Sequence, residues 1–190
     1  MKVLTWIAWV ALFSVGCSSS NAKRVSKSKR SADRSFYAAQ VASRGSHQYL
    51  YVHGESTLLT RRGKAVAPRH APRQVHLAIQ AGNRLQGKPY RWGGGHAKVE
   101  DRGYDCSGTV SYALIHAGLL GSPMPSSGFR RYGKRGPGKW ITIYVKPGHT
   151  FMTIGGLRLD TGWGKARSGP KWRPGARPTD GYIMRHPPGL

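Results

Sequence analysis

The segment "YDCSGTVSYALIHAG", residues 104–118, places an acid, a cysteine and a serine directly before a short apolar run. The apolar residues of this run recur at helical spacing, which predicts a helix; they are Val110, Ala113, Leu114 and Ala117. Asp105 is of a residue type that favours the N-cap position, and Gly118 is of the type that ends helices. Cys106 is therefore predicted to be the first residue of this helix.

A thiol at the start of a helix has chemical consequences. Free backbone N–H groups and the positive end of the helix dipole favour a thiolate at Cys106, and the same N–H groups can stabilise an oxyanion. Such a thiol needs an imidazole as its proton partner to act as a nucleophile. The alternative is that Cys106 is a small core residue, because Val110 lies one turn further along the same face.

The segments around this helix predict the fold class. The residues "RQVHLAIQAGNRLQGKP" from Arg73 have a second helical pattern. After the Cys106 helix, "WITIYV", "HTFMTI" and "LRLDT" are typical of strands, with Gly155-Gly156 as a hairpin turn, and "GYIMRH" is a last short strand. Helices followed by strands predict an α+β fold, with helices packed on an antiparallel sheet.

Of the eight histidines, the predicted hairpin favours His149 as the proton partner of Cys106. With Gly155-Gly156 as the turn, Met152 lies opposite Leu159, and Asp160 shares a face with His149 one diagonal step away. Diagonal neighbours are about 7–8 Å apart at Cα, within reach of a side-chain hydrogen bond. A carboxylate in this place would orient the imidazole.

Both assignments have alternatives. His96, in the glycine-rich loop, is the other histidine that remains as a candidate base. His149 could be only a turn residue after Pro147-Gly148, and Asp160 could be a surface residue paired with one of the many arginines.

The first residues predict export. The run from Val3 to Val15 follows one basic residue, as in a secretory signal, and is shorter than the ~20 apolar residues that cross a bilayer. Gly16 before Cys17 and the serines after it resemble a bacterial lipoprotein signal, with Cys17 as the lipid attachment site. An ordinarily cleaved signal and an uncleaved anchor are the alternatives. All three place the protein in the cell envelope, at its periplasmic or extracellular face, and argue against nucleic acid as a partner.

Charge and composition divide the chain into three parts. We expect a signal segment over residues 1–17, a flexible basic tether over 18–73 with one strand near Gln48 to Val52, and a folded domain over 74–190. The chain has 31 Lys and Arg residues against 7 acids, for a formal net charge of +24, which predicts an anionic partner. A disulfide between Cys17 and Cys106 is disfavoured because Cys17 adjoins the signal.

Three runs in order, "GKPYRWGGG", "YDCSGTVSYALIHAGL" and "PGHTFMTIGGLRLDT", resemble the NlpC-type cell-wall cysteine peptidases. The resemblance implies a papain-like core and hydrolysis of amide bonds in peptidoglycan stem peptides, often between D-γ-glutamyl and a diamino acid. It implies Cys106 as nucleophile, His149 as base and Asp160 as the third polar residue. It further implies that Asp105 and Ser107 bind the polar end of the substrate, for instance a free amine, and that Tyr90 lines the substrate cleft near Cys106.

The sequence departs from the family's pattern in three respects, one of which is that no companion wall-binding domain is visible beside the expected basic tether. The third residue is often His in the family but is Asp160 here, after a hairpin one residue shorter. The usual Pro-Gly-Asp step before the first strand is absent, and "KWITIYV" stands there instead. The departure at Asp160 keeps the chemistry possible, because a carboxylate can also orient an imidazole.

No cofactor and no metal are expected. The chain has no CxxC or HExxH motif, and its three adjacent glycines lack the spacing of nucleotide-binding loops. The expected partners are peptidoglycan, an anionic cell-surface polymer and a membrane reached through the lipid anchor. Three other functions remain open: a non-catalytic basic envelope protein that binds murein or anionic polymer, an antibacterial effector with the same chemistry, and a hydrolase of another amide or thioester.

Overall fold

The computed structural model describes residues 49–50, 57–162, 168–174 and 177–190. The predicted signal segment, Cys17 and most of the predicted tether lie outside these residues. Within them, no helix is both long enough and apolar enough to cross a membrane.

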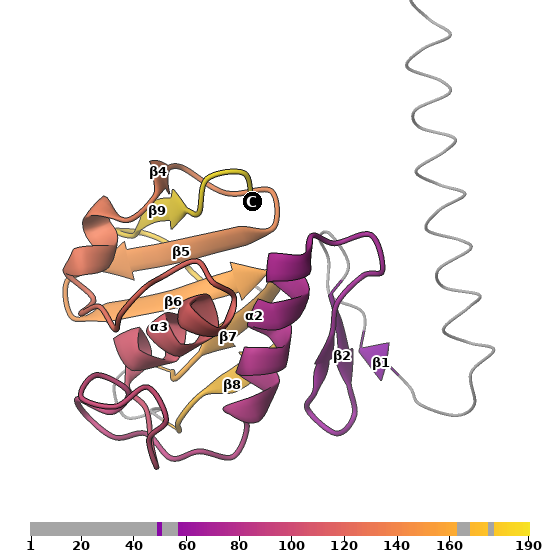
Figure 1. Cartoon of the computed structure of the whole chain (residues 1–190), viewed down its shortest axis with the longest axis horizontal. Helices are drawn as coiled ribbons and strands as arrows, with labels where there is room; N and C mark the ends of the chain where they lie inside the picture. The colour runs from indigo at the N-terminus through magenta and orange to yellow at the C-terminus, as the bar shows by residue number, and fades with distance from the viewer. Residues whose placement is uncertain (1–48, 51–56, 163–167, 175–176) are drawn as a thin grey trace, which may run out of the picture. The chain divides into compact units, whose positions relative to one another are not determined.

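The centre of the fold is a six-stranded antiparallel sheet with the order β4-β9-β5-β6-β7-β8 (Figure 1). Its strands are β4 Lys134–Arg135, β5 Ile141–Lys146, β6 His149–Ile154, β7 Leu157–Asp160, β8 Lys171–Arg173 and β9 Ile183–His186. The predicted strands are confirmed as β5, β6, β7 and β9. The predicted register of the β6–β7 hairpin is also confirmed, because Met152 lies opposite Leu159 and Ile154 opposite Leu157.

Two helices lie against one face of this sheet (Figure 1). Helix α2, Arg73–Arg84, begins directly after Pro72, and α3, Cys106–His116, begins directly after Asp105. A short 3-10 helix, η1 Gly128–Arg131, follows and packs against β5 and β9. The predicted α+β architecture, with helices packed on an antiparallel sheet, is therefore confirmed.

The core lies between the helices and the sheet, and strand alternation decides which side chains enter it. Side chains of β6 that point toward the helices, such as Met152 and Ile154, are fully buried in the hydrophobic core. Each such side chain contributes about 1.5–3 kcal/mol to folding. His149 and Phe151 alternate with them and so point to the other face of the strand. His149 lies at the end of β6 because it is the first residue of that strand, and the alternation directs its side chain away from the apolar core.

The folded part begins earlier in the chain than the sequence predicted. A small sheet is formed by β1 Tyr49–Leu50, β2 Leu58–Thr60 and β3 Ala65–Val66. Leu59 and Ala65 belong to the hydrophobic core, and the Asn83 side chain of α2 makes two hydrogen bonds with the backbone of Ala65, of 2.7 and 2.8 Å. The boundary expected near Arg73 is therefore corrected, because two buried side chains and a paired backbone tie residues 57–66 to α2.

Candidate active site

The N-terminus of α3 is built by Asp105 and the glycine-rich loop. The Asp105 carboxylate accepts hydrogen bonds from the backbone N–H groups of Gly108, at 2.7 Å, and of Gly93, at 3.1 Å. This confirms Asp105 as the N-cap. Gly94 and Gly95 lie directly on Gly108, and a Cβ added at Gly108 would collide with the carbonyl oxygen of Gly94. The glycines thus allow the loop to touch the helix where Cys106 begins it.

Cys106 is a free thiol and is partly exposed. Burial raises the pKa of this thiol above its ordinary value, and the charge of Asp105 raises it further, although the backbone N–H of Thr150 lowers it. At this helix end desolvation thus outweighs the N–H groups, which favour a thiolate. A proton acceptor has to come from elsewhere. Thr150 directly follows His149, so the thiol lies beside the start of β6.

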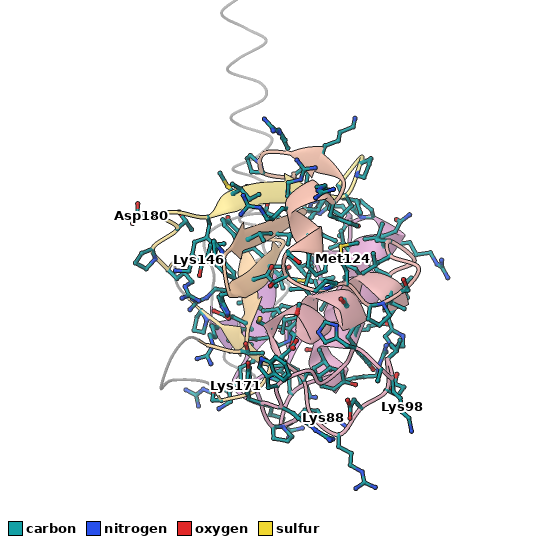
Figure 2. All side chains as sticks on the ribbon, turned by 90° about the vertical axis from the view of Figure 1, so that its left-hand side faces the viewer. Lys88, Lys98, Met124, Lys146, Lys171 and Asp180 are labelled. Carbon is teal, nitrogen blue, oxygen red and sulfur yellow. The ribbon has the colours of Figure 1, made fainter. Side chains whose placement is uncertain are left out.

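His149 is the first residue of β6, after the turn at Pro147-Gly148, and it contacts Asp160 at the end of β7. The distance between His149 Nε2 and Asp160 Oδ1 is 3.1 Å, and the two residues are only 3% and 1% exposed. The sequence predicted that these side chains come within hydrogen-bonding reach, and the structure brings them together. Figure 2 looks at this end of the sheet, where Lys146 is the register partner of His149.

The Asp160 carboxylate is buried yet charged. Burial acts to raise its pKa, but the hydrogen bond and charge of His149 and the charges of Arg177 and Arg158 lower the pKa overall. The guanidinium of Arg177 donates to Asp160 Oδ2 at 2.8 Å, and that of Arg158 does so at 3.4 Å. The backbone N–H of Gly162 donates to Oδ1 at 3.0 Å. Asp160 is thus both paired with arginine, as one alternative held, and buried against His149.

Arg177 and Tyr182 belong to this cluster and were not predicted. Arg177 Nη1 lies 3.3 Å from His149 Nε2, and its guanidinium sits over the rings of Phe151 and Tyr182, at 5.2 and 5.7 Å from their centroids. The Tyr182 ring meets the His149 ring edge-on, with centroids 6.5 Å apart. No sequence signal separates Arg177 from the other Lys and Arg residues, of which the chain has 31. Only the fold of the segment before β9 places it here.

His96, the alternative base, lies at the start of α3 and contacts neither Asp160 nor β6 through any hydrogen bond found among the described residues. His96 Nε2 lies 3.1 Å from Asp105 Oδ1 and 3.1 Å from Ser107 Oγ. Asp105 and Ser107, predicted to bind the substrate, therefore form one polar cluster with His96. Tyr90 is held next to this cluster, because its backbone pairs with Tyr104, the neighbour of Asp105.

No group of three or more His, Cys, Asp or Glu side chains is placed to hold a metal ion in the part of the chain that the structure describes.

No protein-family model and no curated protein matches this chain. Solved structures similar to it include the peptidoglycan hydrolase RipB of Mycobacterium tuberculosis, with 22% identity over 60% of this chain and 68% of that chain and a TM-score of 0.45. The P60 domain of an antigen of M. avium subspecies paratuberculosis has 23% identity over 59% of this chain and 93% of that chain, with a TM-score of 0.44. An NlpC/P60 family protein of Bacillus cereus has 20% identity over 74% of this chain and 53% of that chain, with a TM-score of 0.46.

Proposed function

We propose that this protein is a cysteine hydrolase that cleaves amide bonds in peptidoglycan stem peptides, at the bond between D-γ-glutamyl and a diamino acid. The observation that carries the proposal is the buried hydrogen bond between His149 and Asp160 beside the thiol of Cys106. A nucleophile, an imidazole and a group that orients the imidazole are the three parts that covalent amide hydrolysis needs. The choice of substrate rests on the resemblance of the motifs to NlpC-type peptidases.

The first half of the reaction forms an acyl-enzyme. His149 takes the proton of Cys106 through Nδ1 as the sulfur attacks the carbonyl carbon, since Nε2 is engaged by Asp160. A transfer during attack fits the pKa of Cys106, which burial raises, so that the thiol holds its proton until the substrate arrives. Backbone N–H groups at the start of α3 stabilise the oxyanion.

The second half releases the products. His149 gives its proton to the leaving amine, the C–N bond breaks, and a thioester remains on Cys106. A water molecule, deprotonated by His149, then hydrolyses this thioester, so that the acid is released and the thiol returns. Asp160 stabilises the imidazolium in both halves, and Arg177 acts as a positioning residue that keeps Asp160 ionised.

We also propose how the protein binds its substrate and where it is located. Asp105, Ser107 and Tyr90 bind the amine end of the substrate, in competition with His96 for the Asp105 carboxylate. The protein is exported to the cell envelope and anchored through a lipid on Cys17, with residues 18–48 as a tether whose charge favours anionic surface polymer. Neither a cofactor nor a metal takes part in these steps.

Digestion of purified stem peptides, followed by mass spectrometry, tests the proposal. We expect wild-type protein to release the two halves of the γ-glutamyl–diamino acid bond, and Cys106→Ala to release none. Asp160→Asn should lower turnover about a hundredfold or more, because the imidazole loses its orienting carboxylate. Asp180→Asn is the matched control, since Asp180 is exposed at the edge of the molecule (Figure 2), and it should keep wild-type turnover.

Equal product from wild type and Cys106→Ala would refute the proposal. If neither protein cleaves while both bind murein equally, the chain is the non-catalytic basic envelope protein instead.

A further inference from the structure

A groove of about 670 Å³ lies between η1 and β9 and is rich in arginine. We call it the arginine groove; its charged residues are Arg130, Arg131, Arg135 and Arg185. Tyr182, Ile183 and Met184 also line it, and Ile183 and Met184 are each 38% exposed. The groove has the size of a site for a short peptide or a small molecule.

The guanidinium groups of the arginine groove have no acidic partner. No carboxylate side chain lines the groove, and none of the four arginines forms an ion pair with an acid of the described residues. Arg185 is fixed in place, since it donates to the carbonyl oxygens of Tyr132 at 2.7 Å and of Gly133 at 3.2 Å. Positive charges gathered in a hollow without a counter-charge favour an anionic ligand. Guanidinium groups suit carboxylates best, because they can donate two parallel hydrogen bonds.

The arginine groove adjoins the candidate active site through Tyr182. The Tyr182 side chain lines the groove, and its ring centroid lies 6.5 Å from that of His149 and 5.2 Å from that of Phe151. Burial raises the pKa of the Tyr182 hydroxyl, as expected for a ring packed against His149 and Phe151. Tyr182 therefore belongs both to the lining of the groove and to the cluster around His149.

A second groove differs in its charge. It lies along the glycine-rich loop, has a volume of about 690 Å³, and contains Glu100 and Asp101 among its basic residues. Asp101 Oδ1 lies 3.7 Å from Arg91 Nη1, so the charges of that groove are partly paired within the protein. The unpaired guanidinium groups distinguish the arginine groove as the one suited to an anion.

We propose that the arginine groove binds carboxylate groups of the peptide that is cleaved at Cys106, and so selects substrates with free carboxylates. This inference rests on the proposed function. The apolar side chains of Ile183 and Met184 would contact the aliphatic part of the same amino acid. A peptide is favoured over a phosphodiester polymer because four arginines line this one groove beside the cluster around His149, whereas a polymer calls for a longer basic stripe.

Binding to the full chain carrying Cys106→Ala tests the inference without cleavage. The double variant Arg130→Gln/Arg131→Gln is compared with Arg61→Gln/Arg62→Gln, which removes two equally exposed charges from the β2–β3 turn. The probes are a stem peptide with free carboxylates and the same peptide with those carboxylates amidated. We expect the groove variant to weaken binding of the free peptide roughly tenfold or more, as loss of charge-assisted hydrogen bonds predicts, and binding of the amidated peptide less than about twofold.

The control variant should change neither affinity by more than about twofold, and the unfolding midpoints of both variants should match the parent's. Equal weakening by the two variants would overturn the inference, because it would show only general charge attraction. Unchanged binding by the groove variant would overturn it as well. Poly(glycerol phosphate) serves as a third probe. If the groove variant lost binding to this polymer but kept binding to the peptide, the inference would also be overturned, because the groove would then bind a phosphodiester polymer. Failure of the proposed function appears separately, as absence of cleavage by the protein with Cys106 intact.

Discussion

At the scale of single residues, the site depends on a carboxylate that is buried but stays charged. Asp160 is 1% exposed, and in such a place an isolated carboxylate would take up a proton. Three groups prevent this, since His149, Arg177 and Arg158 all lie within 3.4 Å of its oxygens. A negative charge fixed beside the imidazole is what the proposed reaction needs.

The charge of Asp160 predicts how stability depends on pH. Its pKa is lower in the folded protein than the ordinary value of about 3.9 that it has when unfolded. The stabilisation is therefore complete above about pH 4 and is lost as pH falls through the lower folded pKa. We expect Asp160→Asn to reduce the free energy of unfolding by about 3 kcal/mol at pH 7, as for a broken buried ion pair, and the difference from wild type to shrink on acidification.

Urea unfolding of wild type and Asp160→Asn from pH 7 to pH 2 measures this difference. Asp180→Asn serves as control and should show a difference near zero throughout, because Asp180 is exposed. A difference for Asp160→Asn that stays constant or grows as pH falls would be inconsistent with an ionised Asp160.

The sequence predicted the contact between His149 and Asp160 but not the contact of either with Arg177. The first follows from a hairpin whose two glycines fix the register, so counting residues from the turn places both side chains on one face. Arg177 arrives from a loop between β8 and β9, where no periodic pattern fixes a side chain. Its place depends on tertiary structure, which local pattern does not encode.

At the scale of elements, the start of α3 depends on glycines, because their lack of a side chain allows the backbone of the glycine-rich loop to contact the backbone of the helix. Gly94 and Gly95 contact Gly108, and the Gly94 carbonyl also accepts the backbone N–H of Asp105 at 3.3 Å. These contacts fix the loop against the helix, and Asp105 holds both through its two oxygens. The position of Cys106 is set by this packing.

Substituting Gly108 should show how strictly the packing is required. A methyl group there would collide with the Gly94 carbonyl oxygen, so we expect Gly108→Ala to lower the free energy of unfolding by at least about 2 kcal/mol, as overpacking does. Gly121→Ala is the matched control, because a Cβ at Gly121 meets nothing within 4 Å, and it should change stability by less than about 0.5 kcal/mol. Thermal and urea unfolding measure both. Equal stability of the two variants would contradict this account of the helix start.

The sequence predicted β6 and α3, but it did not predict β4 or β8. The β6 and α3 segments carry periodic apolar residues and clear end signals. Strands β4 and β8 have only two and three residues, too few for a period, and are defined by pairing with β9 and β7. The β2–β3 hairpin was hidden in a basic segment because only Leu58, Leu59 and Ala65 of it are buried apolar residues.

At the scale of the whole molecule, acids are scarce, and the buried ones lie at the candidate site. Of the five acids among the described residues, Asp105 and Asp160 are buried, at 8% and 1% exposure, and the other three are not. Asp105 caps the helix of the thiol, and Asp160 contacts His149. The two buried negative charges of the described residues therefore both lie in the candidate site.

The most direct test of the central claim is detection of the covalent intermediate. Wild-type protein is mixed with a stem peptide and quenched in acid within milliseconds to seconds, and its intact mass and the peptide containing Cys106 are measured. The account predicts a transient mass increase equal to the acyl half of the substrate, located on Cys106 and absent from Cys106→Ala. Product release by wild type without any adduct, together with undiminished cleavage by Cys106→Ala, would contradict it.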